Sequence, residues 1–307
     1  MEIRHLRTFL TVGKLLSFHQ AAQSLNYAQS SISAQIQALE EELDVKLFDR
    51  LGRRILLTEA GERLVPYAEK IIDLADETRT EIGGGAEPAG SLTIRVPESL
   101  GIHRLPSVIY EFSKRLPGIR LNLINCAHET LPKELRNGAI DLAFLLSESF
   151  HASDVEVEAL GAESLALVAC PGNPLAKKRL VRTRDLAGET LVLSKVDCSY
   201  RRLFEKILEE KGIPLEATRI FHSVGFLKQC VMAGAGITIL PEIAISEEIE
   251  KRRLVRLRWE EDNLEVSILM IWSKGRWVSP TLTAFMAIIR AAARRGWKQS
   301  KTRISSD

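Results

Sequence analysis

The chain has 307 residues, of which 45% are hydrophobic and 27% are charged, and its net charge at pH 7 is +2. This length exceeds what one hydrophobic core usually organises, so we expect two or three domains. The near-neutral charge excludes a uniformly basic surface, although a nucleic-acid binder can be nearly neutral when its basic residues are clustered.

The first residues, MEIRHLRTFLTVGKLL, carry charges and no small-residue cleavage site, which argues against a secretory signal. No apolar run approaches the ~18 residues that a membrane span needs. We therefore expect a cytoplasmic protein with no membrane partner. The cysteines form no CxxC pair, so we expect reduced thiols, no metal site and no cofactor; they are Cys126, Cys170, Cys198 and Cys230.

The amino-terminal segment has the pattern of three short helices. Apolar residues at mostly helical spacing predict a helix over residues 3–15, and Ser17 is placed to cap a second helix with the sequence FHQAAQSL. A narrow apolar stripe predicts a third helix; it consists of Ile32, Ile36, Leu39 and Leu43. The stretch LFDRLGRRILLT then favours a two-stranded hairpin, and three helices followed by a hairpin form a winged helix-turn-helix.

A longer helix is predicted from Thr58 to about Ile82. Its apolar seam is too long for so small a domain to cover, which implies a partner helix; the seam comprises Leu64, Val65, Ala68, Ile71, Ile72 and Ala75. The run GGGAEPAG, residues 83–90, then predicts a hinge, because Gly gives freedom and Pro88 stops the helix.

Beyond the hinge, short β-branched runs alternate with helical ones, which favours parallel α/β sheets. The predicted strands are LTIRV, RLNLIN, IDLAFLL, ESLALVA, TLVLS, RIFHS, ITILP, LVRLRW and LEVSILMIW.

Over nearly its whole length the chain resembles the LysR-type transcriptional regulators. The motifs that carry the resemblance follow one another in the family's order: LRTFLTV, SFHQAAQSLNYAQSSISAQIQALEEELDVKLFDR, RRILLTEAG, GAIDLAF, CPGNPLA and VMAGAGITILP. The resemblance implies a multidomain α/β protein with a periplasmic-binding-protein-like effector domain. The implied parts are a winged helix-turn-helix at 1–58, a dimerising linker helix and hinge at 59–90, an effector domain at 91–300 and a tail at 301–307. The effector domain would comprise one α/β subdomain at about 91–162 and 269–300 and another at about 163–268.

The function that this resemblance implies is a DNA-binding transcriptional regulator. It would bind double-stranded promoter DNA as a homodimer and homotetramer and respond to a small effector, with RNA polymerase as a further candidate partner. We expect an anionic effector, because helix amino termini favour negative charge. We expect no enzyme, since the sequence has no phosphate loop, GxSxG or HExxH. A solute-binding protein would have two α/β lobes but no DNA-binding head.

The third helix carries the candidate base-reading residues. At about 100° per residue, Ser30, Ser33, Ala34 and Gln37 lie opposite the apolar stripe, and Gln29 projects from the helix start. These slim polar side chains suit a major groove, which offers donors, acceptors and thymine methyl groups. The resemblance supports contacts by Gln29, Ser30 and Ser33, whereas Gln37 rests on geometry alone. The alternative is that they are ordinary small surface residues.

Two features near this helix are unusual for a DNA-binding domain, namely the missing helix cap and the absence of net positive charge. Ala28 lacks the hydroxyl that would cap the helix, and Asn26 is a candidate substitute. Residues 1–60 carry seven basic and seven acidic side chains, so affinity for phosphates must come from local clustering. The candidate cluster lies in the wing and comprises Arg50, Arg53 and Arg54; Arg50 could instead pair with an acidic neighbour.

Effector-binding residues are expected at strand-to-helix turns, where helix amino termini offer backbone N–H groups. Three segments fit, VPESLG, LSKVDCSYRRLF and FHSVGFLKQC, and their candidate residues are Ser99, Leu100, Cys198, Ser199, Tyr200, Ser223 and Val224. The resemblance adds His128, where many relatives carry a small hydroxyl residue. His128 would hydrogen-bond a carboxylate or cap the helix beginning near Leu131. Arg201 would pair with an anionic effector or remain solvated.

Cys198 raises a redox alternative within the same family. By resemblance it matches the sensing cysteine of the peroxide-responsive branch, and a helix amino terminus can lower the pKa of a thiol. No resolving cysteine follows in RRLFEKILEEKG. We therefore prefer a pocket-lining thiol to a redox-responsive regulator.

Overall fold

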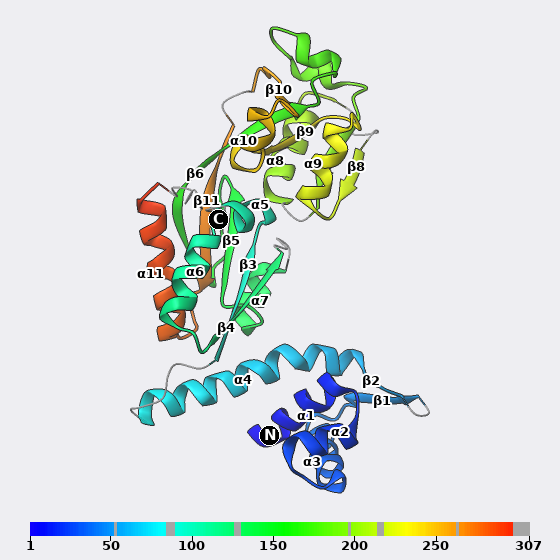
Figure 1. Cartoon of the computed structure of the whole chain (residues 1–307), viewed down its shortest axis with the longest axis vertical. Coiled ribbons are helices and arrows are strands. Elements are labelled where there is room, and N and C mark those ends of the chain that lie inside the picture. The colour runs from blue at the N-terminus through cyan, green and yellow to red at the C-terminus, as the bar shows by residue number, and fades with distance from the viewer. Residues whose placement is uncertain are drawn as a thin grey trace, which may run out of the picture. The chain divides into compact units, whose positions relative to one another are not determined.

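The computed structural model describes residues 1–51, 54–83, 90–125, 130–195, 198–213, 218–261 and 264–296, with a few side chains inside these ranges left out. The chain divides into two compact units, one of Met1–Ser91 with Gly118–Arg120 and one of Leu92–Pro117 with Leu121–Asp307. Figure 1 labels the elements of both units. Among the described residues, no helix is long and apolar enough to cross a membrane.

The first unit, here called the head, is a winged helix-turn-helix followed by a long helix. Its elements are α1 (Ile3–Leu15), α2 (Phe18–Leu25), α3 (Gln29–Leu43), β1 (Phe48–Leu51), β2 (Arg54–Leu57) and α4 (Glu59–Gly83). The predicted cap is confirmed, since the Ser17 hydroxyl accepts a 3.2 Å hydrogen bond from the backbone N–H of Gln20. Strands β1 and β2 pair antiparallel, as predicted for the hairpin.

The apolar stripe of α3 forms the centre of the head. Ile32, Ile36 and Leu39 are buried together with the apolar side of α1. Leu43, which we predicted to join them, is 37% exposed. The helix ends there, because Asp44 takes a left-handed conformation with φ of 52°.

The start of α3 has no side-chain cap. Ala28 stands at the N-cap position without a side-chain hydrogen bond. Asn26 does not replace the missing cap, contrary to our expectation. It ends α2 in a left-handed conformation, with its backbone N–H directed to the carbonyls of Ala22 and Gln23.

Helix α4 covers part of its predicted seam within the head. Ala68 and Ile72 are buried in the head core, and Leu64, Val65 and Ile71 pack against it. The sequence predicted a partner helix for this seam. The head itself covers part of the seam, so a partner is not needed along its whole length. Two large apolar side chains of α4 stay exposed, Tyr67 at 37% and Leu74 at 52%.

The second unit is built on one seven-stranded sheet and one two-stranded sheet. The order of the larger sheet is β10-β6-β11-β5-β3-β4, with β9 also paired to β6, and the smaller sheet is β7-β8. The strands are β3 (Gly90–Val96), β4 (Ile119–Asn125), β5 (Leu142–Ser147), β6 (Val155–Ala169), β7 (Leu191–Ser194), β8 (Thr218–Phe221), β9 (Thr238–Pro241), β10 (Val255–Arg256) and β11 (Glu265–Ser273). The helices are α5 (Glu98–His103), α6 (Pro106–Arg115), α7 (Leu131–Asn137), α8 (Cys198–Glu210), α9 (Val224–Met232), α10 (Glu242–Glu250) and α11 (Pro280–Arg294), with 3-10 turns η1 (Pro174–Lys177) and η2 (Thr183–Leu186).

The predicted α/β class is confirmed, but the expectation of parallel sheets is only half right. Strands β3 and β5 pair parallel, and so do β7 and β8. Strand β11 runs antiparallel to both β5 and β6, and β9 and β10 run antiparallel to β6. The reason is topological, because β6 carries the chain away from the first strands and β11 brings it back alongside.

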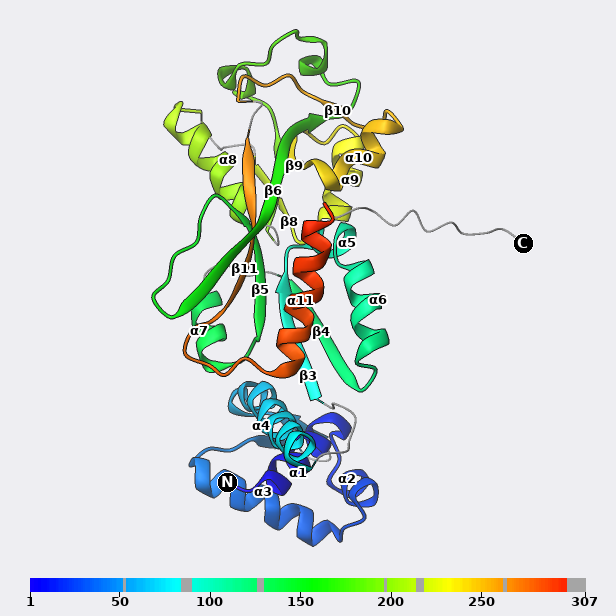
Figure 2. The ribbon, with the colours of Figure 1, turned by 90° about the vertical axis from the view of Figure 1, so that its left-hand side faces the viewer.

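Strands β6 and β11 connect two lobes of this unit. The first lobe contains β3, β4, β5, α5, α6, α7 and α11, and the second contains β7 to β10 and α8 to α10. Residues 155–164 of β6 pair with β11, whereas residues 165–168 pair with β9. The β6–β11 register shifts between Ile268 and Leu269. In the first lobe, α6 and α11 cover one face of the sheet and α7 lies on the other (Figures 1 and 2).

Gly61 gives a test of how α4 joins the wing. A Cβ atom at this position would collide with the backbone carbonyl oxygen of Leu47. We expect Gly61→Ala to lower the stability of the head by about 1–3 kcal/mol through this overpacking. The midpoint of thermal unfolding, followed by calorimetry of the full chain, measures the effect.

Gly13 in α1 supplies the matched control. A Cβ atom there would meet only the side chain of Leu57, at 3.6 Å. Gly13→Ala should therefore stabilise the head by about 0.5–1 kcal/mol, the usual gain over Gly within a helix. Equal midpoints for the two variants would contradict the packing described here.

Candidate DNA-binding surface and effector-binding region

Helix α3 presents a slim polar face. Gln29, Ser30 and Ala34 are exposed, and Ser33 is half-buried. Gln37 is also exposed, but its amide donates a 2.7 Å hydrogen bond to the Glu41 carboxylate one turn later. Gln37 would therefore have to exchange this partner before it could contact a base.

A part-buried polar contact joins α3 to α1 beside the apolar stripe. The hydroxyl of Thr8, which is fully buried in α1, donates a 2.6 Å hydrogen bond to Oε1 of Gln35. Because a buried polar group is costly without a partner, this bond favours one orientation of α3 against α1. The polar face of α3 is thereby directed outward.

Glu40 connects α3 to the wing. Its carboxylate accepts hydrogen bonds from the backbone N–H groups of Leu47, at 2.9 Å, and Phe48, at 3.4 Å, and from Lys46 Nζ at 2.6 Å. Glu40 is 8% exposed. In the sequence Glu40 stands out only as a charge, although its position four residues after Ile36 places it on the buried face of the helix.

Two of the candidate wing arginines, Arg50 and Arg54, stand on opposite strands of the hairpin. Arg50 pairs with Ile55 across the hairpin, and Arg54 pairs with Leu51. Arg53 and the side chains of Arg50 and Arg54 lie outside the described residues. Their contact with phosphates stays a prediction.

Most of the candidate effector residues that the structure describes belong to the core. Ser99 and Leu100 are 1% exposed, and Tyr200 and Val224 are 2% exposed. Their side chains offer no open surface to a ligand in this conformation. Ser199 is half-buried in the first turn of α8, whereas His128 and the side chain of Cys198 lie outside the described residues.

The amino end of α9 already holds a carboxylate. Oε1 of Glu98 accepts hydrogen bonds from the Ser223 hydroxyl, at 3.1 Å, and from Gly225 N–H, at 3.2 Å. Oε2 accepts a third from Val224 N–H at 3.1 Å. The groups of Ser223 and Val224 that we offered to an effector are thus bound by the chain itself. The motif VPESLG contains Glu98, but nothing in the sequence around it indicates this contact.

Two glutamates stand at the carboxyl edge of the first lobe. Strands β3 and β5 are parallel, so the residues that follow them meet at one edge of the sheet. These residues include Glu98 after β3 and Glu148 after β5. Arg201, our other candidate for an anionic ligand, lies 3.5 Å from Glu205 of its own helix.

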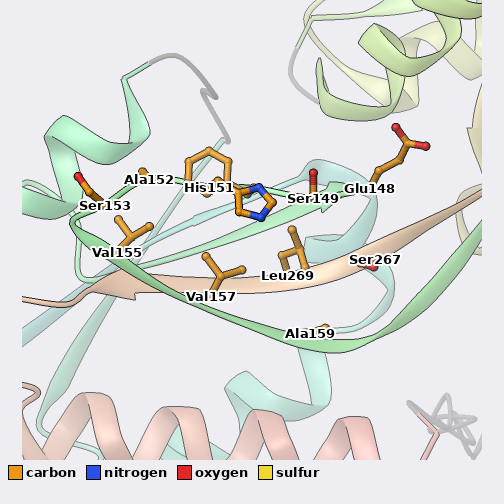
Figure 3. Close-up of a pocket in the computed structure, with 11 residues that line it drawn as sticks. Glu148, Ser149, His151, Ala152, Ser153, Val155, Val157, Ala159, Ser267 and Leu269 are labelled. Atoms are coloured by element: carbon orange, nitrogen blue, oxygen red, sulfur yellow. The ribbon is translucent and has the colours of Figure 1, made fainter.

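A trough of about 720 Å³ lies beside this edge, on the β6 and β11 strands (Figure 3). Its floor is apolar, and His151 projects from the loop over Val157 and Leu269. The described lining residues include none of the candidate effector residues; they are Glu148, Ser149, Phe150, His151, Ala152, Ser153, Val155, Val157, Ala159, Ser267 and Leu269. The rim of the trough is polar, because Glu148, Ser149, His151 and Ser153 stand beside the apolar floor. Within the described residues, no group of three or more His, Cys, Asp or Glu could hold a metal ion.

His103 at the end of α5 provides a pH test of the second unit. Burial lowers its pKa, and the positive charges of Lys228 and Arg104 lower it further, whereas Glu248 and Glu247 act in the opposite direction. The unfolded chain therefore binds this proton first as pH falls. Above the unfolded pKa of about 6.5, His103 is neutral in both states and does not lower the free energy of unfolding. Below that pH the unfolded chain takes up the proton first, so the free energy of unfolding falls.

We expect the melting temperature of the native chain to fall more between pH 7.5 and pH 5.5 than that of His103→Gln. Gln keeps a polar side chain at this position but cannot gain the proton. Calorimetry at both pH values measures the two changes. Identical changes in both proteins would show that His103 does not contribute.

Comparison with known proteins places both units in one family. The model described as "Bacterial regulatory helix-turn-helix protein, lysR family" matches residues 3–62, and the model described as "LysR substrate binding domain" matches residues 85–294. The uncharacterised HTH-type transcriptional regulator YwqM of Bacillus subtilis is 38% identical over 94% of this chain and 99% of its own length. The HTH-type transcriptional regulator GltR of the same species is 32% identical over 94% of this chain and 96% of its own length.

Solved structures show the same fold. Full-length CbnR in complex with its target DNA aligns with a TM-score of 0.67 and 24% identity, over 95% of this chain and all of that one. HinK, a LysR family regulator of Pseudomonas aeruginosa, aligns with a TM-score of 0.55 and 27% identity, over 95% of this chain and 98% of that one. The chain belongs to the LysR family of DNA-binding transcriptional regulators, with an amino-terminal helix-turn-helix and a carboxyl-terminal effector-binding domain.

Proposed function

We propose that this chain binds promoter DNA through α3 and the wing, as an oligomer joined through α4, and that a small molecule bound to the second unit changes transcription. The observation that carries the proposal is the division of α3 into two faces. Ile32, Ile36 and Leu39 are buried, while Gln29, Ser30 and Ala34 are exposed. Helices that enter a major groove need a slim leading face that can donate and accept hydrogen bonds.

We propose that base reading is shared by Gln29, Ser30 and Ser33, with Gln37 as a further contact. The wing arginines Arg50, Arg53 and Arg54 would bind phosphates and position α3 without reading sequence. Gln29 is the first residue of α3, where its long side chain can reach furthest from the head.

We propose a homodimer through α4, further paired into a homotetramer, with RNA polymerase as a candidate partner. Leu64, Tyr67, Ile71 and Leu74 repeat at three- and four-residue spacing along α4, as the a and d positions of a coiled coil do. Leu64 and Ile71 are half-buried, whereas Tyr67 and Leu74 are exposed within one chain. A second α4 would cover this stripe.

We propose a small organic anion as the effector. The amino end of α8 supports this class, because Ser199 is only half-buried there and a helix amino end favours negative charge. The amino end of α9 is taken by Glu98, so the effector would use α8 first. A thermal-shift screen of small carboxylates, followed by gel shifts with any hit, tests this class.

None of the described residues supports the redox alternative through Cys198. Cys198 begins α8, but its side chain lies outside the described residues. We therefore keep effector binding as the proposal.

Gln29→Ala tests the base-reading role. We expect it to cost ~1–3 kcal/mol on the cognate site and much less on random DNA, because the lost contact is to a base edge. Gel shifts measure both affinities, with the cognate site first defined by footprinting on the promoter region of the chain's own gene. Gln229→Ala, in the exposed part of α9, is the matched control and should change neither affinity.

Arg53→Ala provides the contrasting result. It should weaken binding to cognate and random DNA alike and reduce the salt slope by about one, as the loss of one phosphate contact does. If Gln29→Ala also weakens both equally, Gln29 does not read a base.

Leu74→Asp tests the dimer. A charge in the middle of an apolar helix seam should halve the mass measured by sedimentation at micromolar concentration, because a buried unpaired charge is costly. Leu180→Asp is the matched control, since Leu180 is 50% exposed in the second unit and Leu74 is 52% exposed. An unchanged mass for Leu74→Asp would remove α4 as the dimer contact.

A further inference from the structure

Helix α5 is short and lies where the two lobes of the second unit meet. It spans Glu98–His103, directly after the first-lobe strand β3. It packs against α10 of the second lobe, and Figures 1 and 2 both show it next to α9 and α10. Charged residues stand at both of its ends, Glu98 at the start and Arg104 just beyond the last turn.

The start of α5 holds the amino end of α9. Glu98 accepts three hydrogen bonds there, from the Ser223 hydroxyl and from the backbone N–H groups of Val224 and Gly225, all between 3.1 and 3.2 Å. A carboxylate at a helix amino end is stabilised both by these charge-assisted bonds and by the helix dipole. The donor and acceptor lie in different lobes.

The end of α5 is connected to the amino end of α10. Arg104 Nη2 lies 3.0 Å from Oε2 of Glu163, whose other oxygen accepts a 3.1 Å hydrogen bond from Ile243 N–H in the first turn of α10. Glu163 is 6% exposed. A buried carboxylate depends on its partners, because losing one leaves an uncompensated charge.

The two helices that α5 holds are also joined to each other. Lys228 of α9 donates hydrogen bonds to the Ala244 carbonyl oxygen of α10, at 2.7 Å, and to the buried Glu248 carboxylate, at 2.9 Å. Glu98 and Arg104 therefore act on a single connected pair of helices. A movement of the second lobe that broke one contact would strain the other.

We propose that α5 is an interlobe clasp, in which Glu98 and Arg104 together hold the amino ends of α9 and α10 and thereby fix the closure of the effector-binding domain. Reorientation of the lobes requires release of this clasp, so the contacts of Glu98 set how readily the domain changes shape. The link from closure to DNA binding rests on the proposed function, whereas the clasp itself does not.

Hydrogen exchange on the full chain, read at single amides, tests the clasp. In Glu98→Gln, the amides of Val224 and Gly225 should exchange about tenfold faster, because Gln lacks the negative charge and replaces one of the two acceptor oxygens with an NH2 donor. Ile243 should also exchange faster, by severalfold, although Glu98 does not touch it. In Arg104→Gln, Val224 should likewise exchange faster, although Arg104 does not touch it.

Ser279→Ala is the matched control, since Ser279 caps α11 within the first lobe by accepting from Leu282 N–H at 3.1 Å. It should speed exchange at Leu282 and leave Val224 and Ile243 unchanged. If Glu98→Gln affects only Val224 and Gly225, Glu98 is a local helix cap and the clasp is refuted. If it affects none of these amides, the contact itself is refuted.

Gel shifts with the same variants separate this inference from the proposed function. Altered exchange with no DNA binding in any form of the protein would leave the clasp standing and refute the regulator. Normal DNA binding with unaltered exchange would refute the clasp and leave the regulator standing. If Glu98→Gln fails to fold, Arg104→Gln is used instead: faster exchange at Val224 supports the clasp, and unchanged exchange refutes it.

Discussion

A carboxylate that accepts hydrogen bonds from backbone N–H groups is the interaction on which both units depend. Glu40 does this in the head, where it binds the first N–H groups of the wing. Glu98 and Glu163 do it in the second unit, at the amino ends of α9 and α10. In each case the carboxylate belongs to one element and the N–H groups to another. The bond therefore fixes the orientation of two elements and also satisfies groups that would otherwise lack a partner.

In the head, this arrangement allows α3 to remain slim. The helix needs no long charged side chains near its start, because Thr8, Glu40 and the apolar stripe hold it from the inside. Ser and Ala can then occupy the outer face, where a groove would exclude larger residues. In the proposed function, phosphate binding then falls to the wing, where Arg50 and Arg54 stand on opposite strands of the hairpin.

The head was predictable because its signals are local. Helical spacing, a capping serine and a Gly-containing turn each depend on neighbouring residues, and α1, α2 and the hairpin follow them. The errors came where one residue had two local roles. Asn26 could have capped α3 but ends α2, and Leu43 continues the apolar stripe but lies where the helix stops.

The effector-binding region was less predictable, because its contacts join residues far apart in the sequence. The turn motifs placed Ser223 and Val224 at a helix start, as observed, but nothing local indicated that Glu98, 125 residues away from Ser223, would occupy it. Strand direction failed for a similar reason, since β11 returns along β6 after nearly a hundred residues. Ser99, Leu100 and Tyr200 have the residue types of a ligand site, yet burial decides whether a ligand can reach them.

Hydrogen exchange of the full chain with and without DNA shows whether α3 enters the groove. The DNA would be a duplex enriched by selection from a random library. We expect slower exchange over residues 29–37 and the hairpin, with α9 unchanged in the absence of effector. Protection elsewhere in the chain, with residues 29–37 unaffected, would contradict it.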